Sequence, residues 1–126
     1  MARREFDRQR AGREAEAAAA LFLEAQQLTI LLRNYRCRSG ELDIVAQAPS
    51  GTVVVAEVRM RSRRDYGGAA ASVDWRKQHK IARATRHLLL THRQLAACAL
   101  RFDVLDLQSN ADGFAIHWIR HAFEAT

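Results

Sequence analysis

The stretch that decides the fold runs from Gly40 to Arg61 and reads GELDIVAQAPSGTVVVAEVRMR. Two largely apolar runs flank Pro49-Ser50-Gly51, which is typical of a three-residue hairpin loop. A hairpin closed at this loop places Asp43 directly opposite Glu57. Opposed side chains lie about 5 Å apart at Cβ, so two carboxylates there repel unless a proton or a cation lies between them. The pattern therefore predicts a divalent metal site at Asp43 and Glu57.

Side chains alternate between the two faces of a strand, so Asp43 and Val45 are expected on one face and Leu42 and Ile44 on the other. The whole chain predicts one α/β unit with the order α-β-β-β-α-β-β, a mixed sheet flanked by helices. Residues 1–11 are expected to be flexible, and residues 12–126 to form a single domain. Outside the hairpin, the expected elements are a helix over 12–27, a strand over 28–36, a loop over 62–72, a helix from an Asp74 cap to about His92, a strand over 100–107, a turn over 109–113 and a strand over 114–119.

Length and composition limit the class of protein. The chain has 126 residues, enough for one domain with a core, and its 48% hydrophobic content excludes a wholly disordered chain. No apolar run reaches the roughly 18 residues of a membrane span, and no apolar segment follows the charged N-terminus as in a signal peptide. Cys37 and Cys98 do not have the spacing of a metal site. We therefore expect a cytoplasmic protein with two free thiols and no membrane contact.

The charge balance indicates an anionic partner. The chain has 20 Lys and Arg against 14 Asp and Glu, a net charge of +6. An arginine-rich, solvated surface is the simpler explanation, but basic residues cluster around the candidate carboxylates, which favours phosphate binding. Aromatic residues make up only 7%, which argues against a base-stacking platform for single strands. The candidate nucleic-acid contacts are Arg36, Arg38, Arg61, Arg63, Arg64 and Lys80.

The only two lysines of the chain lie together in the segment RKQHK, residues 76–80. On a helical wheel, Trp75 and Ile81 belong to the apolar arc of the predicted helix, and Gln78 falls inside that arc. A glutamine that faces a core needs hydrogen-bond partners, which the carboxylates or their bound water could supply. Lys77 lies at the border of the arc and is expected to reach the site, whereas Lys80 lies on the polar side and is expected to contact phosphate.

Seven short motifs, in order and at compatible spacing, cover the chain from about Gly12 to Phe123. They are Glu16, Arg33-Asn34-Tyr35-Arg36, Gly40-Glu41-Leu42-Asp43, Glu57-Val58-Arg59-Met60-Arg61, Tyr66-Gly67-Gly68, Lys77-Gln78-His79-Lys80 and Arg101-Phe102-Asp103. With these motifs the chain resembles the YraN-like family of uncharacterised bacterial proteins and, through it, the restriction-endonuclease-like or PD-(D/E)xK superfamily. The resemblance implies a nuclease-like fold whose site comprises an acid from the first helix, Asp43, Glu57 and the residue two positions after Glu57.

The candidate chemistry is phosphodiester hydrolysis. A metal ion polarises the scissile phosphate and lowers the pKa of an attacking water, and Mg²⁺ or Mn²⁺ suits carboxylate ligands. Asp43 and Glu57 fit that role, and Glu41 is a candidate third ligand or an ion-pair partner for Arg59. Glu16 could contribute through water or a second metal, although an acid in a first helical turn is also ordinary.

The chain departs from the superfamily at Arg59, where the resemblance implies a lysine. Arginine stays protonated and cannot act as a general base, although it binds phosphate well. One explanation is that the required amine has moved from the strand to the helix, at Lys77. Gln78 completes the set of candidate catalytic residues.

Three functions remain open at this point. The first is a Mg²⁺-dependent or Mn²⁺-dependent nuclease acting on DNA, with branched or structured DNA as one substrate class; a homodimer would suit such a substrate. The second is a nucleic-acid-binding module that keeps the fold but has lost hydrolysis, with Arg59 marking the loss. The third is an adaptor whose basic face binds an acidic protein.

Overall fold

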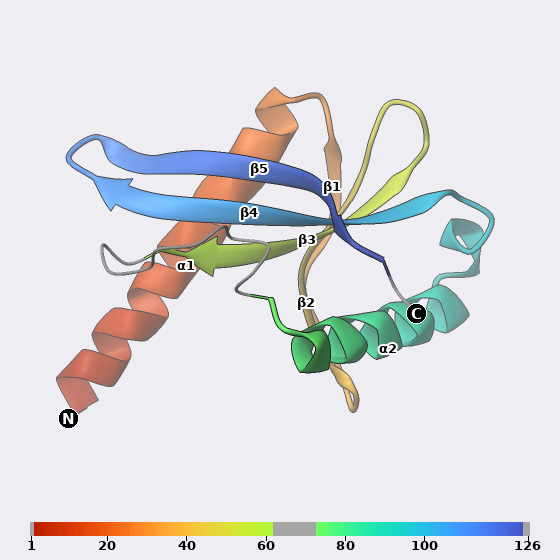
Figure 1. The fold of residues 1–126 in the computed structure, drawn as a ribbon, viewed down its shortest axis with the longest axis horizontal. Coiled ribbons are helices and arrows are strands. Elements are labelled where there is room, and N and C mark those ends of the chain that lie inside the picture. The colour runs from red at the N-terminus through yellow and green to blue at the C-terminus, as the bar shows by residue number, and fades with distance from the viewer. Residues whose placement is uncertain (1, 62–72, 125–126) are drawn as a thin grey trace.

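The computed structural model describes residues 2–61 and 73–124 and folds them into a five-stranded sheet with a helix on each face (Figure 1). The elements are α1 (Ala2–Ala25), β1 (Thr29–Cys37), β2 (Gly40–Gln47), β3 (Val53–Met60), α2 (Trp75–Thr91), the 3₁₀ turn η2 (Arg93–Leu95), β4 (Leu100–Asn110) and β5 (Gly113–Phe123). The strand order is β1-β2-β3-β4-β5, and β3 and β4 are parallel whereas the other neighbours are antiparallel. The predicted α/β class, mixed sheet and element order are confirmed.

Some boundaries differ from the predicted ones. Helix α1 begins at Ala2 rather than at Gly12, because the first residues are also good helix formers and an Arg10–Glu14 ion pair of 3.3 Å joins successive turns. The predicted flexibility of residues 1–11 stays a prediction. Strands β4 and β5 extend past their predicted ends, because the turn that joins them comprises only Ala111 and Asp112. The predicted loop over 62–72 lies outside the described residues.

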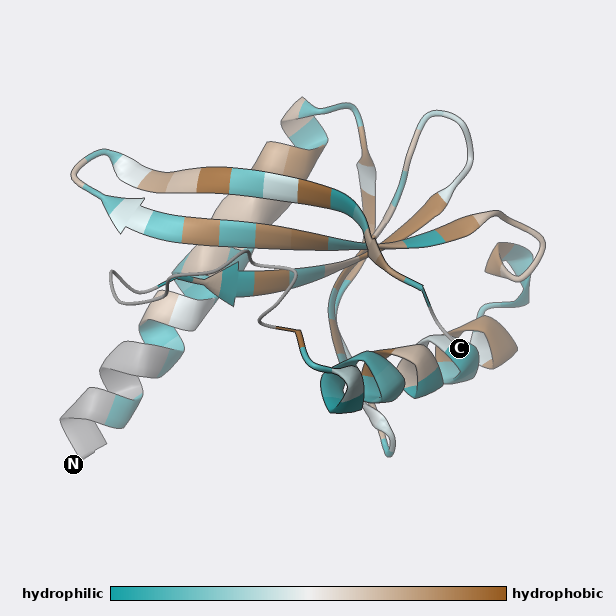
Figure 2. Ribbon diagram, viewed as in Figure 1, coloured by the Kyte–Doolittle hydropathy of each residue, from teal (hydrophilic) through white to brown (hydrophobic). Residues whose placement is uncertain are grey.

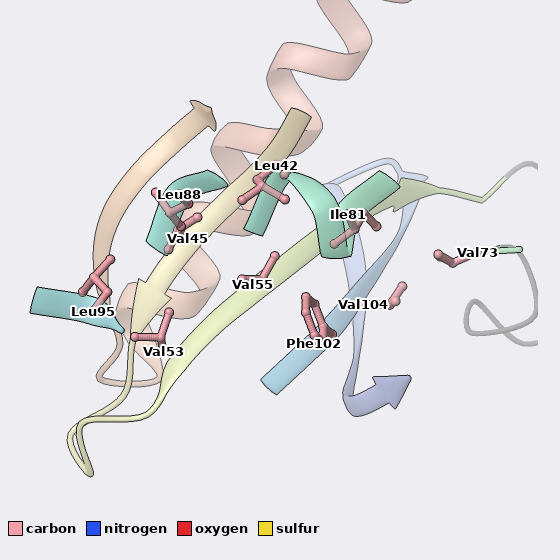
Figure 3. Packing of buried hydrophobic residues seen from close by; sticks show 11 residues of the cluster. Leu42, Val45, Val53, Val55, Val73, Ile81, Leu88, Leu95, Phe102 and Val104 are labelled. Atoms are coloured by element: carbon pink, nitrogen blue, oxygen red, sulfur yellow. The ribbon is translucent and has the colours of Figure 1, made fainter. Parts of the chain in front are cut away.

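The two faces of the sheet carry separate cores. On one face, Leu42, Val45 and Val55 pack with Ile81 and Leu88 of α2 (Figure 3). On the other face, α1 packs through a stripe of small and aliphatic residues against Ile44, Val54 and their neighbours, with Ala15, Ala19 and Leu23 on the helix side. Because both faces are covered, the hairpin strands are apolar on both sides. Among the described residues, the buried charged side chains are Asp43, Glu57, Asp103 and Asp106.

The hairpin register is the predicted one. The ladder runs from Gln47↔Val53 to Ile44↔Ala56, and the next position along it is Asp43 opposite Glu57. Strict alternation fails at Asp43, because Leu42 joins the same core as Val45. The neighbouring strand explains the break: Asn34 of β1 stands opposite Asp43, has a φ of +54° and is skipped by the β1–β2 ladder. The left-handed backbone of Asn34 on β1 thus interrupts the regular pleat beside Asp43.

Asp103 is buried for a structural reason. Its carboxylate accepts hydrogen bonds from Arg101 Nε at 3.1 and 3.2 Å, Trp118 Nε1 at 2.8 Å and the His121 backbone N–H at 3.1 Å. These donors offset the cost of burying the charge and fasten β4 to β5 at an irregularity in their register. The role of Asp103 is therefore to hold this edge of the sheet together.

Helix α2 starts as predicted at Asp74, whose Oδ1 accepts the Lys77 backbone N–H at 2.9 Å. We expect Asp74→Ala to lower the free energy of unfolding by about 1 kcal/mol, because the helix loses its N-terminal cap. Urea denaturation followed by circular dichroism measures this change. Asp112→Ala, at an exposed turn aspartate, is the control, and an equal effect of the two substitutions would contradict the capping role.

Candidate active site

Asp43 lies where the β2–β3 ladder ends. Its Oδ2 accepts the backbone N–H of Val58 at 2.9 Å, and its side chain is nearly buried. Burial is the main cause that raises the pKa of Asp43, and the Val58 hydrogen bond opposes it. The carboxylate is therefore held rigidly by the backbone of the neighbouring strand rather than by solvent.

Glu57 lies beside Asp43 and is only 4% exposed. Burial, followed by the negative charge of Asp43, raises the pKa of Glu57 to about 7. A hydrogen bond between the two carboxyl groups lowers the pKa of Asp43 and raises the pKa of Glu57. Burial and the neighbouring negative charge thus disfavour the doubly ionised pair, as expected for opposed carboxylates.

Lys77 brings a positive charge to this pair from α2. Its Nζ lies 2.6 Å from Glu57 Oε1, and its side chain is partly exposed. The ammonium lowers the pKa of both carboxyl groups, although less than burial raises them. The predicted approach of Lys77 to the carboxylates is confirmed.

Glu16 of α1 approaches the pair from the opposite face of the sheet. Burial and then the Asp43 carboxylate raise the pKa of Glu16, while a hydrogen bond from the Asn34 side chain lowers it. Sequence reasoning placed Asn34 in a matched motif but gave it no role. The available signal was an asparagine inside a predicted strand, since asparagine is depleted in strands and enriched at positive φ.

The metal site predicted at Asp43, Glu57 and Glu16 is matched only in part by the described residues. Among them, no three Asp, Glu, His or Cys side chains come close enough together to form a metal centre, so Glu16 does not complete a three-residue group with Asp43 and Glu57. Two carboxylates suffice for Mg²⁺ when waters and a substrate phosphate supply the other oxygens. The hard oxygen donors and the raised pKa values of the two carboxyl groups fit a cation held between Asp43 and Glu57.

Three expectations near the site need correction. Gln78 donates its side-chain amide to the backbone carbonyl of Val73 at 2.8 Å, so a backbone group meets its need for a partner. Trp75 is 65% exposed and does not join the core, which α2 contacts through Ile81, Ala84 and Leu88. Glu41 pairs with Arg36 at 3.3 Å, whereas Arg59 is half-buried on β3.

The candidate nucleic-acid contacts fall into three groups. Arg38 and Lys80 are exposed. Arg36 and Arg61 form ion pairs, Arg36 with Glu41 on the surface and Arg61 with the buried Asp106 at 3.2 Å. The remaining two, Arg63 and Arg64, lie outside the described residues, as does the Tyr66-Gly67-Gly68 motif.

Two hollows share Glu41 as a lining residue, and one of them is also lined by Glu16 and the other by Lys77. One, of about 480 Å³, lies between α1 and β1 and is lined by Arg13, Glu16, Asn34 and Arg36, among others. The other, of about 470 Å³, lies at the start of α2 and is lined by Gly40, Arg76, Lys77 and Lys80, among others. Both combine acidic with basic side chains, so a phosphate backbone could approach the acids alongside guanidinium or ammonium groups.

In the part of the chain that the structure describes, no helix combines the length and the apolar character needed to cross a membrane. Among solved structures, that of Pyrococcus furiosus SfsA in complex with Ca²⁺ matches this chain with a TM-score of 0.29 and 12% identity, over 79% of this chain and 57% of that chain. This similarity is too low to bear on function.

Similarity in sequence to bacterial proteins is much higher than this structural similarity. A UPF0102 protein of Cupriavidus taiwanensis is 45% identical over 121 residues, which are 96% of this chain and 88% of that protein. A UPF0102 protein of Nitrosomonas europaea is 46% identical over 113 residues, which are 90% of this chain and 92% of that protein. Residues 15–107, which include Asp43, Glu57 and Lys77, match the profile described as "Uncharacterised protein family UPF0102". The chain therefore belongs to the uncharacterised protein family UPF0102.

Proposed function

We propose that this protein is a metal-dependent nuclease that hydrolyses phosphodiester bonds in DNA. One observation carries the proposal: the carboxylates of Asp43 and Glu57 are both buried on adjacent strands, and Lys77 Nζ lies 2.6 Å from Glu57 Oε1. Buried acids with perturbed pKa values are frequent at functional sites. A hydrophobic hairpin has no structural need of such a pair.

Each residue of the candidate active site has a distinct role in this proposal. Asp43 and Glu57 would hold Mg²⁺ or Mn²⁺, which when bound polarises the scissile phosphate and lowers the pKa of a coordinated water. The Val58 backbone N–H fixes the orientation of Asp43. Lys77 favours the ionised form of Glu57 and restricts its side chain, which prepares the pair for a cation. Glu16 and Asn34 add negative charge and orientation from the α1 side.

DNA as the partner is supported by charge. The net charge is +6, and Arg76 and Lys80 line the same hollow as Lys77, whose Nζ contacts Glu57. The resemblance to restriction-endonuclease-like proteins favours DNA, and branched or structured DNA is the finer proposal within that class. Electrostatic contact with phosphates predicts binding that weakens steeply as salt increases.

A cleavage assay tests the proposal. End-labelled single-stranded, duplex, flap and four-way-junction DNA are each incubated with Mg²⁺, Mn²⁺ or EDTA. We expect products with a divalent cation and none in EDTA, and the best-cut substrate identifies the preferred DNA shape. Failure to cut any of the four substrates with either metal would contradict the proposed activity.

A second candidate function is nucleic-acid binding without hydrolysis, and Arg59 is the observation that favours it. The two functions make different predictions for Arg59→Lys. If Lys77 supplies the amine, this substitution changes the cleavage rate by less than about threefold, since both side chains are cationic. If Arg59 marks a loss of activity, the substitution creates cleavage that the wild type lacks.

Lys77→Met tests the role of Lys77 directly. Methionine keeps much of the side-chain volume but removes the charge next to Glu57. We expect cleavage to fall by about 10- to 100-fold, as is usual when a residue that orients a metal ligand is lost. Initial rates at saturating Mg²⁺ measure this, and Arg93→Met, which removes an exposed charge just after the same helix, is the matched control. Equal rates for Lys77→Met and the wild type would exclude a positioning role.

A further inference from the structure

The outward face of α2 is basic along its length. Five of the 17 residues of the helix are Lys or Arg, and none is Asp or Glu. We call the outward basic face the exposed set formed by Arg76, His79, Lys80, Arg83, Arg86 and His87. Figure 2 shows the first turns of α2 as hydrophilic, in contrast to its more hydrophobic C-terminal end. The candidate active site uses only Lys77, on the inner flank of this helix.

Helix stability does not explain this composition. Like charges three or four residues apart, such as Arg76 with Lys80 and Arg83 with Arg86, disfavour a helix, and α2 has no acid of its own to offset them. A bound polyanion would remove this repulsion. The positive end of the helix dipole also lies at Trp75, so the first turn attracts anions further.

Trp75 adds an aromatic ring to the start of this face. Its side chain is 65% exposed, although the N-cap of the helix is supplied by Asp74 and nothing in the capping requires an indole. The ring is held in place: the His79 ring meets it edge-on at a centroid distance of 5.4 Å, and the Arg76 guanidinium lies 5.8 Å from its centroid. An exposed but oriented indole can stack on a base with little loss of conformational entropy.

The basic side chains of α2 and the exposed Trp75 ring belong to the same surface. The first turn of α2 presents Trp75 outward and Lys77 to Glu57, so the outward basic face begins next to the candidate active site. The helix is about 25 Å long, comparable with the tract of a few nucleotides that single-strand-binding proteins cover. We propose that the outward basic face of α2 binds a single-stranded segment of the nucleic-acid substrate, with Trp75 stacking on an unpaired base beside the candidate active site.

This inference rests on the proposed function for the nature of the partner, and it specifies the substrate as nucleic acid with an unpaired segment. It differs from a base-stacking platform, which needs aromatic residues in series; here one ring supplies one stacking contact and the cations follow the phosphates. A purely acidic protein would use the cations but not the ring. Trp75 therefore distinguishes nucleic acid from an acidic protein.

The test measures binding without cleavage. Fluorescein-labelled 12-mer oligothymidylate, an abasic 12-mer and a 12-base-pair duplex are titrated in EDTA by fluorescence anisotropy. We expect Trp75→Ala to weaken oligothymidylate binding by about 5- to 100-fold, the usual range for one stacked base, and Trp75→Phe to weaken it less. Arg83→Ala should lower the slope of log K against log salt by about 0.7, the value for one phosphate contact on a single strand.

Leu90→Ala is the matched control, because Leu90 is also exposed on α2 but lies at its far end. The difference in tryptophan emission between the wild type and Trp75→Phe isolates the signal of Trp75, which should be quenched by oligothymidylate and not by the abasic strand. Equal affinity of Trp75→Ala and the wild type, or equal affinity for abasic and base-bearing strands, would overturn the inference.

The binding and cleavage assays separate the two proposals. Single-strand binding that depends on Trp75, with no cleavage of any DNA in Mg²⁺ or Mn²⁺, supports the inference and removes the nuclease. Metal-dependent cleavage that is unchanged in Trp75→Ala on flap and single-stranded substrates supports the nuclease and removes the inference. Competition by poly-glutamate as strong as by oligothymidylate also argues against it, since an acidic chain offers no base.

Discussion

Replacing Asp43 by asparagine is expected to lower metal-dependent DNA cleavage by on the order of 10²- to 10³-fold, the usual effect of removing one electrostatic element of an active site. Asparagine keeps the shape of the side chain but removes the negative charge that a divalent cation needs. Initial rates on the preferred DNA substrate measure the loss. Affinity for DNA in EDTA should stay almost unchanged, because the Asp43 side chain is buried and a negative charge does not attract phosphate.

Two controls make this result interpretable. Asp112→Asn alters an exposed aspartate far along the chain and should cleave like the wild type. Isothermal titration with Mg²⁺ and Mn²⁺ should show binding to the wild type and not to Asp43→Asn. Full cleavage by Asp43→Asn, with a circular dichroism spectrum like that of the wild type, would place the activity away from the carboxylate pair.

The core of this site could be predicted because a hairpin fixes its own register. The three-residue loop at Pro49-Ser50-Gly51 decides which residues of the two strands pair, because turn type and loop length fix the register of a hairpin. The opposition of Asp43 and Glu57 follows directly from that pairing. The approach of Lys77 follows from the helical period, given an Asp74 cap that sets where the helix begins.

Other parts of the site depend on packing that no local pattern specifies. The helical period alone assigned Trp75 to the core, but α2 packs on the sheet through Ile81, Ala84 and Leu88 and leaves the ring exposed. Alternation assigned Leu42 to the face away from Val45, whereas the left-handed Asn34 on the adjacent strand interrupts the pleat there. Gln78 found a backbone carbonyl rather than a carboxylate. In each case a tertiary neighbour, absent from the local sequence, decided the outcome.

Glu57→Gln is expected to stabilise the metal-free protein at pH 8 by up to about 3 kcal/mol. Glu57 is 4% exposed, and burial followed by the Asp43 charge raises its pKa from 4.5 to about 7. Between these values the folded protein binds a proton that the unfolded chain has released. Stability is therefore complete below about pH 4.5 and falls as pH rises to about 7, by on the order of 3 kcal/mol.

Urea denaturation in EDTA at pH 5 and pH 8 measures this effect. Glutamine cannot ionise, so Glu57→Gln should lose much of the pH dependence, and its advantage over the wild type should be large at pH 8 and small at pH 5. Glu24→Gln, at an exposed glutamate of α1, is the control. If Glu57→Gln is less stable than the wild type at pH 8, then the Glu57–Lys77 ion pair stabilises the fold and the case for a cation site weakens.

Added Mg²⁺ or Mn²⁺ tests the same carboxylate pair through its effect on stability. A divalent cation that binds the folded state alone stabilises it in proportion to the logarithm of its concentration. Mg²⁺ or Mn²⁺ should therefore restore stability to the wild type at pH 8 and have no such effect on Glu57→Gln, whose neutral amide is a weak ligand. A carboxylate pair of this kind destabilises the metal-free fold, and a single mutation to an amide would remove that destabilisation. A role in the stability of the fold therefore does not explain the pair. The proposed metal-dependent function would then account for both charges.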